Sequence, residues 1–338
     1  MATLRSDVIV PEVFTAYVDE AVTTRSAFLS SGVIQPLDIL NATEGGDYVN
    51  VPSWTANLTG DAEVLSDSTS LTPGKISAEK QICPVLHRGR AWEVRTLAAL
   101  AAGDDPMAAI GRKVADYISH QQQKDVFSIL KGVFGPLTSN TTGALKSLAI
   151  DSNATAGVLS PGKVAEARAA LGDQGEKLSV IAMHSKVYYD LVERRAIDYV
   201  TATDARQTAA ATMDGAFGGS MVGAFTPNLE VPYFMGMQVI VSDDVNNDGT
   251  NYASYLFTPG AMASGTQSGL VTETDRDILA LSDALSVHWH NLYHPLGLSY
   301  KSGGVNPSRT TLETATNWEQ IYETKNLGIV SIVSNPNF

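Results

Sequence analysis

The sequence predicts an α+β fold in which an extended front third is followed by one long helix and then by a mixed region of short strands and helices. Three observations indicate this class. Residues 51–97 are mainly extended and rich in turn residues, residues 106–135 keep helical spacing, and strand-like apolar runs recur from residue 178 to the end. Strands and helices that are segregated along the chain, rather than strictly alternating, are typical of α+β proteins.

The composition favours a subunit that buries surface against its neighbours. Of the 338 residues, 44% are hydrophobic, so the chain can form a substantial core. Only 17% are charged, whereas about 25% is usual for a soluble domain. Charged residues are depleted in the cores of protein interfaces, and this deficit is what an assembling subunit would show.

The formal net charge is −13, and the chain has no basic tract. Sequence-specific binding of nucleic acid normally needs a basic stripe that neutralises phosphates, so we expect none. Cys83 is the only cysteine, which excludes an intrachain disulfide. The first residues lack the apolar stretch of a secretory signal, and the apolar run at 97–102 is too short to span a bilayer. We therefore expect folding in a reducing cytosol and no association with a membrane.

Residues 1–50 form a loosely patterned arm. Pro11 keeps the residue before it extended, and a short helical stripe then runs through Phe14, Val18, Val22 and Phe28. These few apolar positions cannot build a core of their own, so we expect the arm to lie on another surface.

Residues 51–97 predict a long β-hairpin. Alternating residues at 47–54 lead into a polar, turn-rich segment at 55–75, and residues 75–93 are extended again. An isolated two-stranded ribbon is marginally stable in water. The hairpin must therefore lie against a surface of its own chain or of a neighbour.

Four charged residues of this hairpin are candidate contacts between subunits. Arg88 and Arg90 flank a glycine on the second extended segment, and Asp61 and Glu63 lie near the tip. An Arg-Gly-Arg sequence can bind phosphate or carboxylate. Because the same hairpin also carries carboxylates, we expect these arginines to form ion pairs with the carboxylates of neighbouring copies of the chain.

The strongest helix signal lies at 106–135. Asp104 or Asp105 can cap this helix, and Pro106 suits its first turn. Apolar residues at helical spacing continue until Gly132 and Gly135, so the helix has roughly thirty residues, which is long for a globular protein. We interpret it as a spine for the fold.

Shorter elements follow the long helix. We expect helices near 160–171 and 187–192, strands at 178–183, 237–241, 252–257 and 328–333, and a strand pair formed by 284–287 and 288–290. Residues 203–227 are rich in Ala, Gly and Thr and predict a loop.

His288, His290 and His294 form the best candidate for a metal site. A His-x-His sequence on a strand places both imidazoles on one face, which zinc or iron can use. No Asp or Glu lies nearby to complete the ligand set, so a structural role is favoured over a metal-dependent enzyme.

Residues 244–249 match the first half of a calcium-binding loop. The twelfth position is Tyr255 instead of the bidentate glutamate, and the flanking segments read as strands. A hairpin turn made by Asn247, Asp248 and Gly249 explains the pattern as well, and weak calcium binding stays open.

The other motifs associated with catalysis are incomplete. Lys75 and Lys163 follow glycines but precede Ile76 and Val164, where a phosphate-binding loop needs a hydroxyl. Cys83 lies in an extended apolar run, which favours a buried side chain over a nucleophile. We expect no catalytic site and no cofactor.

Two segments, residues 233–244 and residues 294–300, look like parts of phage coat proteins in which a glycine turn leads into a core strand. Together with the order of arm, hairpin, long helix, mixed domain and terminal strand, they give nearly the whole chain a resemblance to the Hong Kong 97 phage capsid fold.

This resemblance implies a domain layout and an assembly. Residues 1–50 would be the N-terminal arm, 51–97 the extended loop, 98–160 the peripheral domain with its spine helix, 161–300 the axial domain, and 301–338 a return to the peripheral domain. The chain would be the major capsid protein of a tailed phage, assembled in the host cytoplasm as hexamers and pentamers into an icosahedral shell around double-stranded DNA. The expected partners are further copies, a separate scaffolding protein, a portal and a decoration protein.

Some relatives crosslink a loop lysine to an asparagine. Lys75 and Lys80 lie in the loop here, but no asparagine or assisting glutamate can be matched to them, so crosslinking stays open. Two alternatives also stay open at this point: an encapsulin-like compartment shell with the same fold, and, from another class, a metal-dependent enzyme using His288, His290 and His294.

Overall fold

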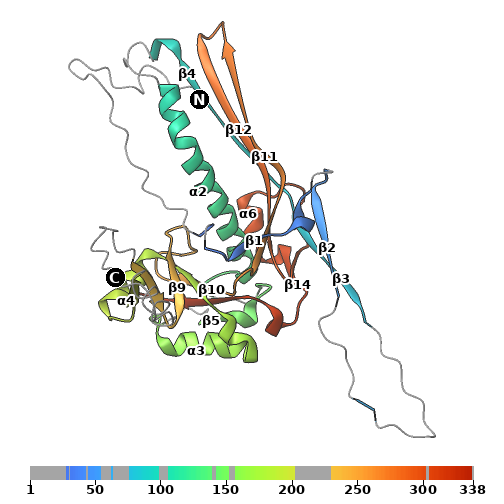
Figure 1. Cartoon of the computed structure of the whole chain (residues 1–338), viewed down its shortest axis with the longest axis vertical. Helices are drawn as coiled ribbons and strands as arrows, with labels where there is room; N and C mark the ends of the chain where they lie inside the picture. Colours follow the sequence, from blue (N-terminus) through green and yellow to red (C-terminus); the bar gives the residue numbers. More distant parts are fainter. Residues whose placement is uncertain are drawn as a thin grey trace, which may run out of the picture.

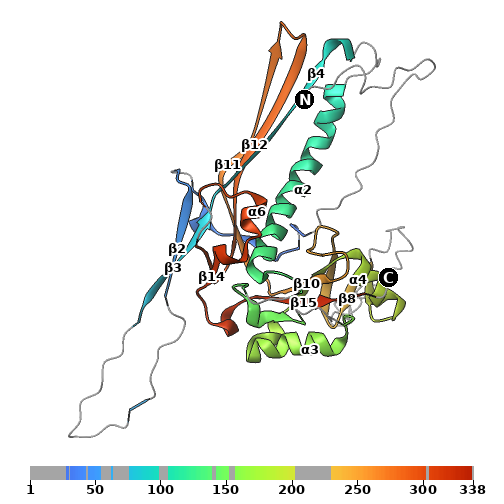
Figure 2. The same ribbon diagram turned by 180° about the vertical axis from the view of Figure 1, so that it is seen from behind.

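The computed structural model describes residues 28–29, 31–42, 45–54, 62–63, 76–98, 106–138, 142–151, 157–201, 230–301 and 304–336. One long helix runs from the middle of the molecule beside a tall sheet, a second sheet with its helices lies below, and a two-stranded ribbon extends outward from the base of the tall sheet (Figure 1). The view from behind shows the same arrangement (Figure 2).

The long helix is confirmed as α2, Pro106–Phe134, with 29 residues. It ends where Gly135 adopts a positive φ of 77°, a conformation that glycine reaches without a steric penalty. The C-terminal half of α2 packs Phe127, Leu130 and Val133 into the main core. The capping candidates Asp104 and Asp105 lie outside the described residues.

The tall sheet has four strands in the order β1-β11-β12-β4, which span Ile34–Pro36, Met262–Asp277, Ser282–Pro295 and Leu86–Arg95. The strand pair predicted at 284–287 and 288–290 is wrong, because both segments belong to the single strand β12. Val287 and Trp289 on one face pack against Ile118 of α2. The alternation of buried and less buried side chains therefore continues through His288 without a turn. β11 was not predicted, since its outer half is exposed and polar.

The lower sheet has seven strands in the order β5-β15-β10-β6-β9-β8-β7. Their bounds are Ala149–Ile150, Ile329–Ser334, Tyr252–Phe257, Val180–Met183, Met237–Val241, Glu230–Phe234 and Asp198–Thr201. β6, β10 and β15 are buried throughout, as expected for central strands with both faces covered. The helices α3, Pro161–Ala170, and α4, Ser185–Glu193, complete this part.

The hairpin expected between 237–241 and 252–257 is wrong. Both strands form, but β6 lies between β9 and β10 and pairs with each of them. The fully buried strand β6, Val180–Met183, occupies the place in the sheet where β9 and β10 would have paired with each other. The segment that joins β9 to β10 therefore crosses the end of β6 and does not form a hairpin between them.

The ribbon consists of β2, Tyr48–Trp54, and β3, Ala78–Pro84, in antiparallel pairing. The extended segment expected at 75–93 is divided at Val85, whose N–H donates to the Asp47 carbonyl. Beyond Val85 the chain leaves the ribbon and becomes β4, which pairs with β12. Most of the polar segment at 55–75 lies outside the described residues, as does the loop expected at 203–227.

The remaining short elements are η2 Asp38–Leu40, η3 Lys146–Leu148, η4 Gly172–Lys177, β13 Leu298–Tyr300, α6 Arg309–Leu312, η5 Ala315–Asn317, β14 Trp318–Gln320 and η6 Thr324–Asn326. The spatial units do not follow simple sequence ranges. β11 and β12 fall within 161–300 yet lie beside α2, and the terminal strand β15 lies inside the lower sheet. The division into arm, loop, peripheral and axial domains stays a prediction.

Candidate assembly surfaces

The four charged residues predicted as contacts lie in different settings. Asp61 is outside the described residues, and Glu63 is exposed. Arg88 and Arg90 lie on β4, in the tall sheet and not in the ribbon. Contacts of these residues with another subunit stay a prediction.

Arg88 is bound within its own chain. Its Nε lies 3.5 Å from Asp125 Oδ2 on α2. One terminal nitrogen donates to Asn306 Oδ1 at 3.0 Å, and the other donates to the Pro307 carbonyl at 2.8 Å. Arg88 therefore ties β4 to α2 and to the segment before α6, contacts that sequence reasoning missed.

His288, His290 and His294 do not meet at one point. The ring of His290 stacks on His87 with centroids 4.2 Å apart, while His288 lies tilted at 5.9 Å from His290. His294 is fully buried and bonds Gln81 Oε1 through Nε2 at 2.9 Å. Within the described ranges, no group of three or more His, Cys, Asp or Glu side chains is arranged to hold a metal ion.

The carboxylates of the 244–249 segment are bound by protein donors. Gln123 Nε2 donates to Asp244 Oδ2 at 2.9 Å. Asp248 Oδ1 accepts the N–H groups of Thr250 and Asn251, and this backbone donation lowers the pKa of the Asp248 carboxyl. Gly249 has a φ of 88°. The segment forms a tight turn that is held by the side chain of Asp248.

Cys83 is buried, as the sequence indicates. Burial raises the pKa of its thiol, because the thiolate would lose its hydration. This keeps the sulfur protonated and unreactive.

Large apolar side chains are exposed at the outer end of the tall sheet. Leu97, Ile278 and Leu281 are exposed there, and Leu279 is 97% exposed. Asp277 Oδ1 accepts the N–H groups of Leu279 and Ala280, so the turn that displays these residues has a defined structure. We call Leu97, Ile278, Leu279 and Leu281 the apolar tip.

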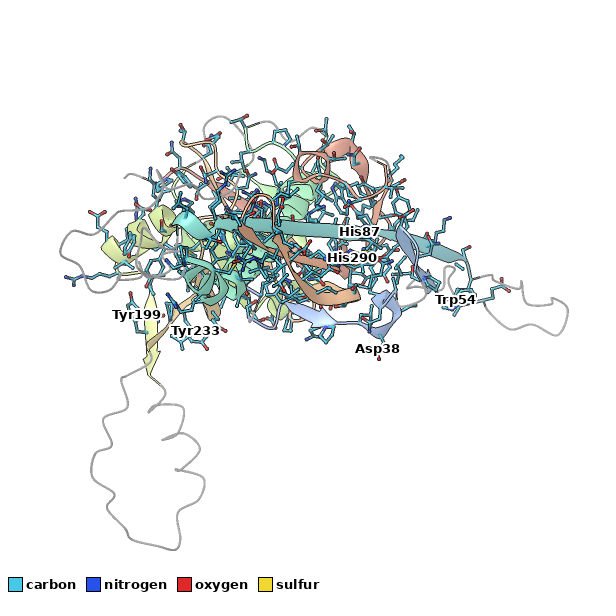
Figure 3. The ribbon with its side chains drawn as sticks, turned by 90° about the horizontal axis from the view of Figure 1, so that it is seen from above. Asp38, Trp54, His87, Tyr199, Tyr233 and His290 are labelled. Atoms are coloured by element: carbon cyan, nitrogen blue, oxygen red, sulfur yellow. The ribbon has the colours of Figure 1, made fainter. Side chains whose placement is uncertain are left out.

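Two further apolar surfaces lie elsewhere. On the ribbon, Trp54 is 66% exposed and Tyr48 is also exposed, and Ile76 is exposed just before β3. Tyr199 on the edge strand β7 and Tyr189 on α4 are exposed, and the Tyr199 hydroxyl lies 3.0 Å from that of Tyr188 on α4. Figure 3 shows Trp54 and Tyr199 at opposite sides of the molecule. Soluble monomers seldom display several such surfaces, which usually mark interaction sites.

No helix in the described part of the chain is both long enough and apolar enough to cross a membrane.

Comparison with known proteins decides the family. The model of the Gp13-like family, described as major capsid protein 13-like, matches residues 13–328. The chain belongs to this family of major capsid proteins. The major capsid protein of Bacillus phage SPP1 is 34% identical over 340 residues, and the match covers 96% of each chain.

Solved phage capsids share the fold of this capsid protein. The cyanophage Pam1 capsid matches with a TM-score of 0.59 at 13% identity, covering 96% of each chain. The capsid of Ralstonia phage GP4 matches with a TM-score of 0.57 at 12% identity, covering 97% of this chain and 96% of that one. These matches confirm the α+β fold of the Hong Kong 97 type.

The capsid protein is a structural component of a phage virion and not an enzyme, since its family consists of structural capsid proteins. The alternative of a metal-dependent enzyme is therefore wrong. Family membership and the phage relative also favour a phage coat over an encapsulin-like compartment.

Proposed function

We propose that this capsid protein assembles as hexamers and pentamers into an icosahedral shell that encloses the double-stranded DNA of a tailed phage. The observation that carries the proposal is the β2–β3 ribbon, which extends beyond the body of the subunit (Figure 1) and exposes Tyr48 and Trp54. A two-stranded ribbon needs a surface to cover it, and a neighbouring copy supplies one.

Burial of the exposed apolar residues supplies the driving force. Transfer of apolar surface out of water contributes about 25 cal/mol per Å². The ribbon, the apolar tip and the exposed tyrosines of α4 and β7 lie on separate sides of the subunit, so one copy can contact several others at once. Many contacts of this kind, each weak alone, add up through multivalency.

We further propose the division into an N-terminal arm at 1–50, an extended loop at 51–97, a peripheral domain built on α2, and an axial domain. The packing of α3 against the lower sheet supports an axial domain within 161–300, whereas β11 and β12 of the same range lie beside α2, so the domains would share segments across these sequence ranges. A separate scaffolding protein, a portal and a decoration protein remain proposed partners, and Asp61, Glu63, Arg88 and Arg90 remain proposed contacts.

Electron microscopy of the full chain, expressed alone and with its neighbouring genes, tests the assembly. We expect shells, partial shells or capsomers. A stable monomer in both preparations, with the ribbon ordered in solution, would contradict the proposal.

A further inference from the structure

Gln81 is a buried amide in a strand that is otherwise exposed toward the ribbon tip. Its side chain is fully buried, while Ala78, Glu79 and Lys80 are exposed. In the ribbon register, Gln81 pairs with Val51, and this is the outermost pair in which both residues are buried. The ribbon thus leaves the body of the subunit at Gln81.

A buried amide needs hydrogen-bond partners, and those of Gln81 come from both sides of this junction. Gln81 Oε1 accepts the N–H of Gly297 at 2.9 Å. The same oxygen lies 2.9 Å from His294 Nε2. Because Oε1 is already an acceptor, His294 carries its proton on Nε2 and donates it. Gln81 Nε2 lies 3.5 Å from Ser53 Oγ in β2.

The partners of Gln81 on the body are held in place. His294 is fully buried in β12. Gly297 lies in the turn between β12 and β13 with a φ of 86°, and a Cβ at this position would overlap Tyr322 and Leu327. The two donors therefore present a fixed pair of hydrogen bonds to one oxygen of the ribbon.

We infer that Gln81 sets the direction in which the β2–β3 ribbon leaves the subunit, and that it is a positioning residue for shell assembly. Other contacts at the base of the ribbon, such as the donation from the Ile82 N–H to Ser299 Oγ at 3.0 Å, lie on the body side of Gln81. They hold the root of the ribbon but do not reach the outer part. The second half of the inference rests on the proposed function, because the direction of the ribbon matters only if the ribbon covers a neighbour.

The direction of the ribbon can be measured before assembly. Spin labels at Glu79→Cys on β3 and Ala115→Cys on α2 report the distance between ribbon and body in the full chain, and both positions are exposed. Cys83 is buried and does not compete for the label. The variants are Gln81→Leu, which removes the contacts with His294, Gly297 and Ser53, and Gln81→Glu, which keeps an acceptor for the His294 and Gly297 donors. The matched control is Gln123→Leu, which changes an equally buried glutamine on α2 that bonds Ser242 and Asp244.

We expect a broadened distance distribution for Gln81→Leu, and the wild-type distribution for Gln81→Glu and for Gln123→Leu. Particles formed by Gln81→Leu should lose the uniform diameter of the wild type. If Gln81→Leu does not fold, Gln81→Asn replaces it, since its shorter side chain cannot reach both donors. If Gln81→Leu, or Gln81→Asn in its place, gave a distance distribution as narrow as that of Gln123→Leu, the inference would be overturned. A wild-type chain that stays monomeric both alone and with its neighbouring genes would instead overturn the proposed function and leave the distance result to decide the role of Gln81.

Discussion

The Nε of Arg309 donates to Asp125 Oδ1 at 2.7 Å, and the Asp125 side chain is only 2% exposed. Arg88 approaches the other oxygen of the same carboxylate. One buried charge on α2 thus joins the tall sheet, through β4, to α6. Buried ion pairs contribute little net stability over an apolar replacement, but removal of one partner leaves an uncompensated charge.

Asp125→Asn should therefore lower the free energy of unfolding by about 3 kcal/mol, because both arginines lose their counter-charge. Urea unfolding of the unassembled subunit measures this. Glu313→Gln is the control, since the side chains of its pair with Lys131 are partly exposed, at 31% for Glu313 and 43% for Lys131, and it should cost less than about 1 kcal/mol. Equal losses in the two variants would contradict the role assigned to Asp125.

Gly132→Ala should destabilise the subunit although alanine favours helices. A Cβ at Gly132 would overlap the Leu312 carbonyl oxygen, which also accepts the hydrogen bond from Trp318 Nε1. Gly111 lies in the same helix with no neighbour in reach of a Cβ, so Gly111→Ala should stabilise by about 1 kcal/mol. Thermal unfolding should show a lower Tm for Gly132→Ala and a higher Tm for Gly111→Ala. A higher Tm for Gly132→Ala would show that α6 is not packed this closely on α2.

Acid should weaken the subunit through His294. Burial lowers the pKa of His294 from its usual 6.5 to about 4. The unfolded chain then takes up this proton at a higher pH than the folded one, so stability falls as the pH drops from 6.5 toward 4. The full effect is roughly 3 kcal/mol.

His294→Gln removes this titration while leaving the other groups unchanged. The difference in unfolding free energy between wild type and His294→Gln should shrink as the pH is lowered from 6.5 toward 4. Parallel pH profiles for the two proteins would rule out a contribution of His294.

Leu279→Asp should block assembly without unfolding the subunit. Leu279 is almost wholly exposed in the isolated chain, so the change should alter the unfolding free energy by no more than about 0.5 kcal/mol. A charge at the apolar tip opposes its burial against another copy. Sedimentation of assembly reactions, with Leu279→Ala as the milder variant, measures the loss of particles. Full yield from Leu279→Asp would remove the tip from the proposed contacts.

The elements whose signals are local could be predicted from the amino-acid sequence. The spacing and stop signals of α2, the apolar runs of β6, β9, β10 and β15, and the burial of Cys83 are all set by neighbouring residues, and the structure contains each of them. The order of these elements was enough to suggest the fold of a phage coat.

Strand pairing and the contacts between buried polar groups could not be predicted from local sequence and became visible in the folded chain. Strand β6 separates β9 from β10, β12 continues through His288, and β4 leaves the ribbon at Val85, because pairing depends on segments far apart in the chain. Gln81 and His294 are 213 residues apart, and Asp125 and Arg309 are 184 apart. No local pattern marks a single glutamine or aspartate as buried, since its partners are brought to it only when the distant segments pack together.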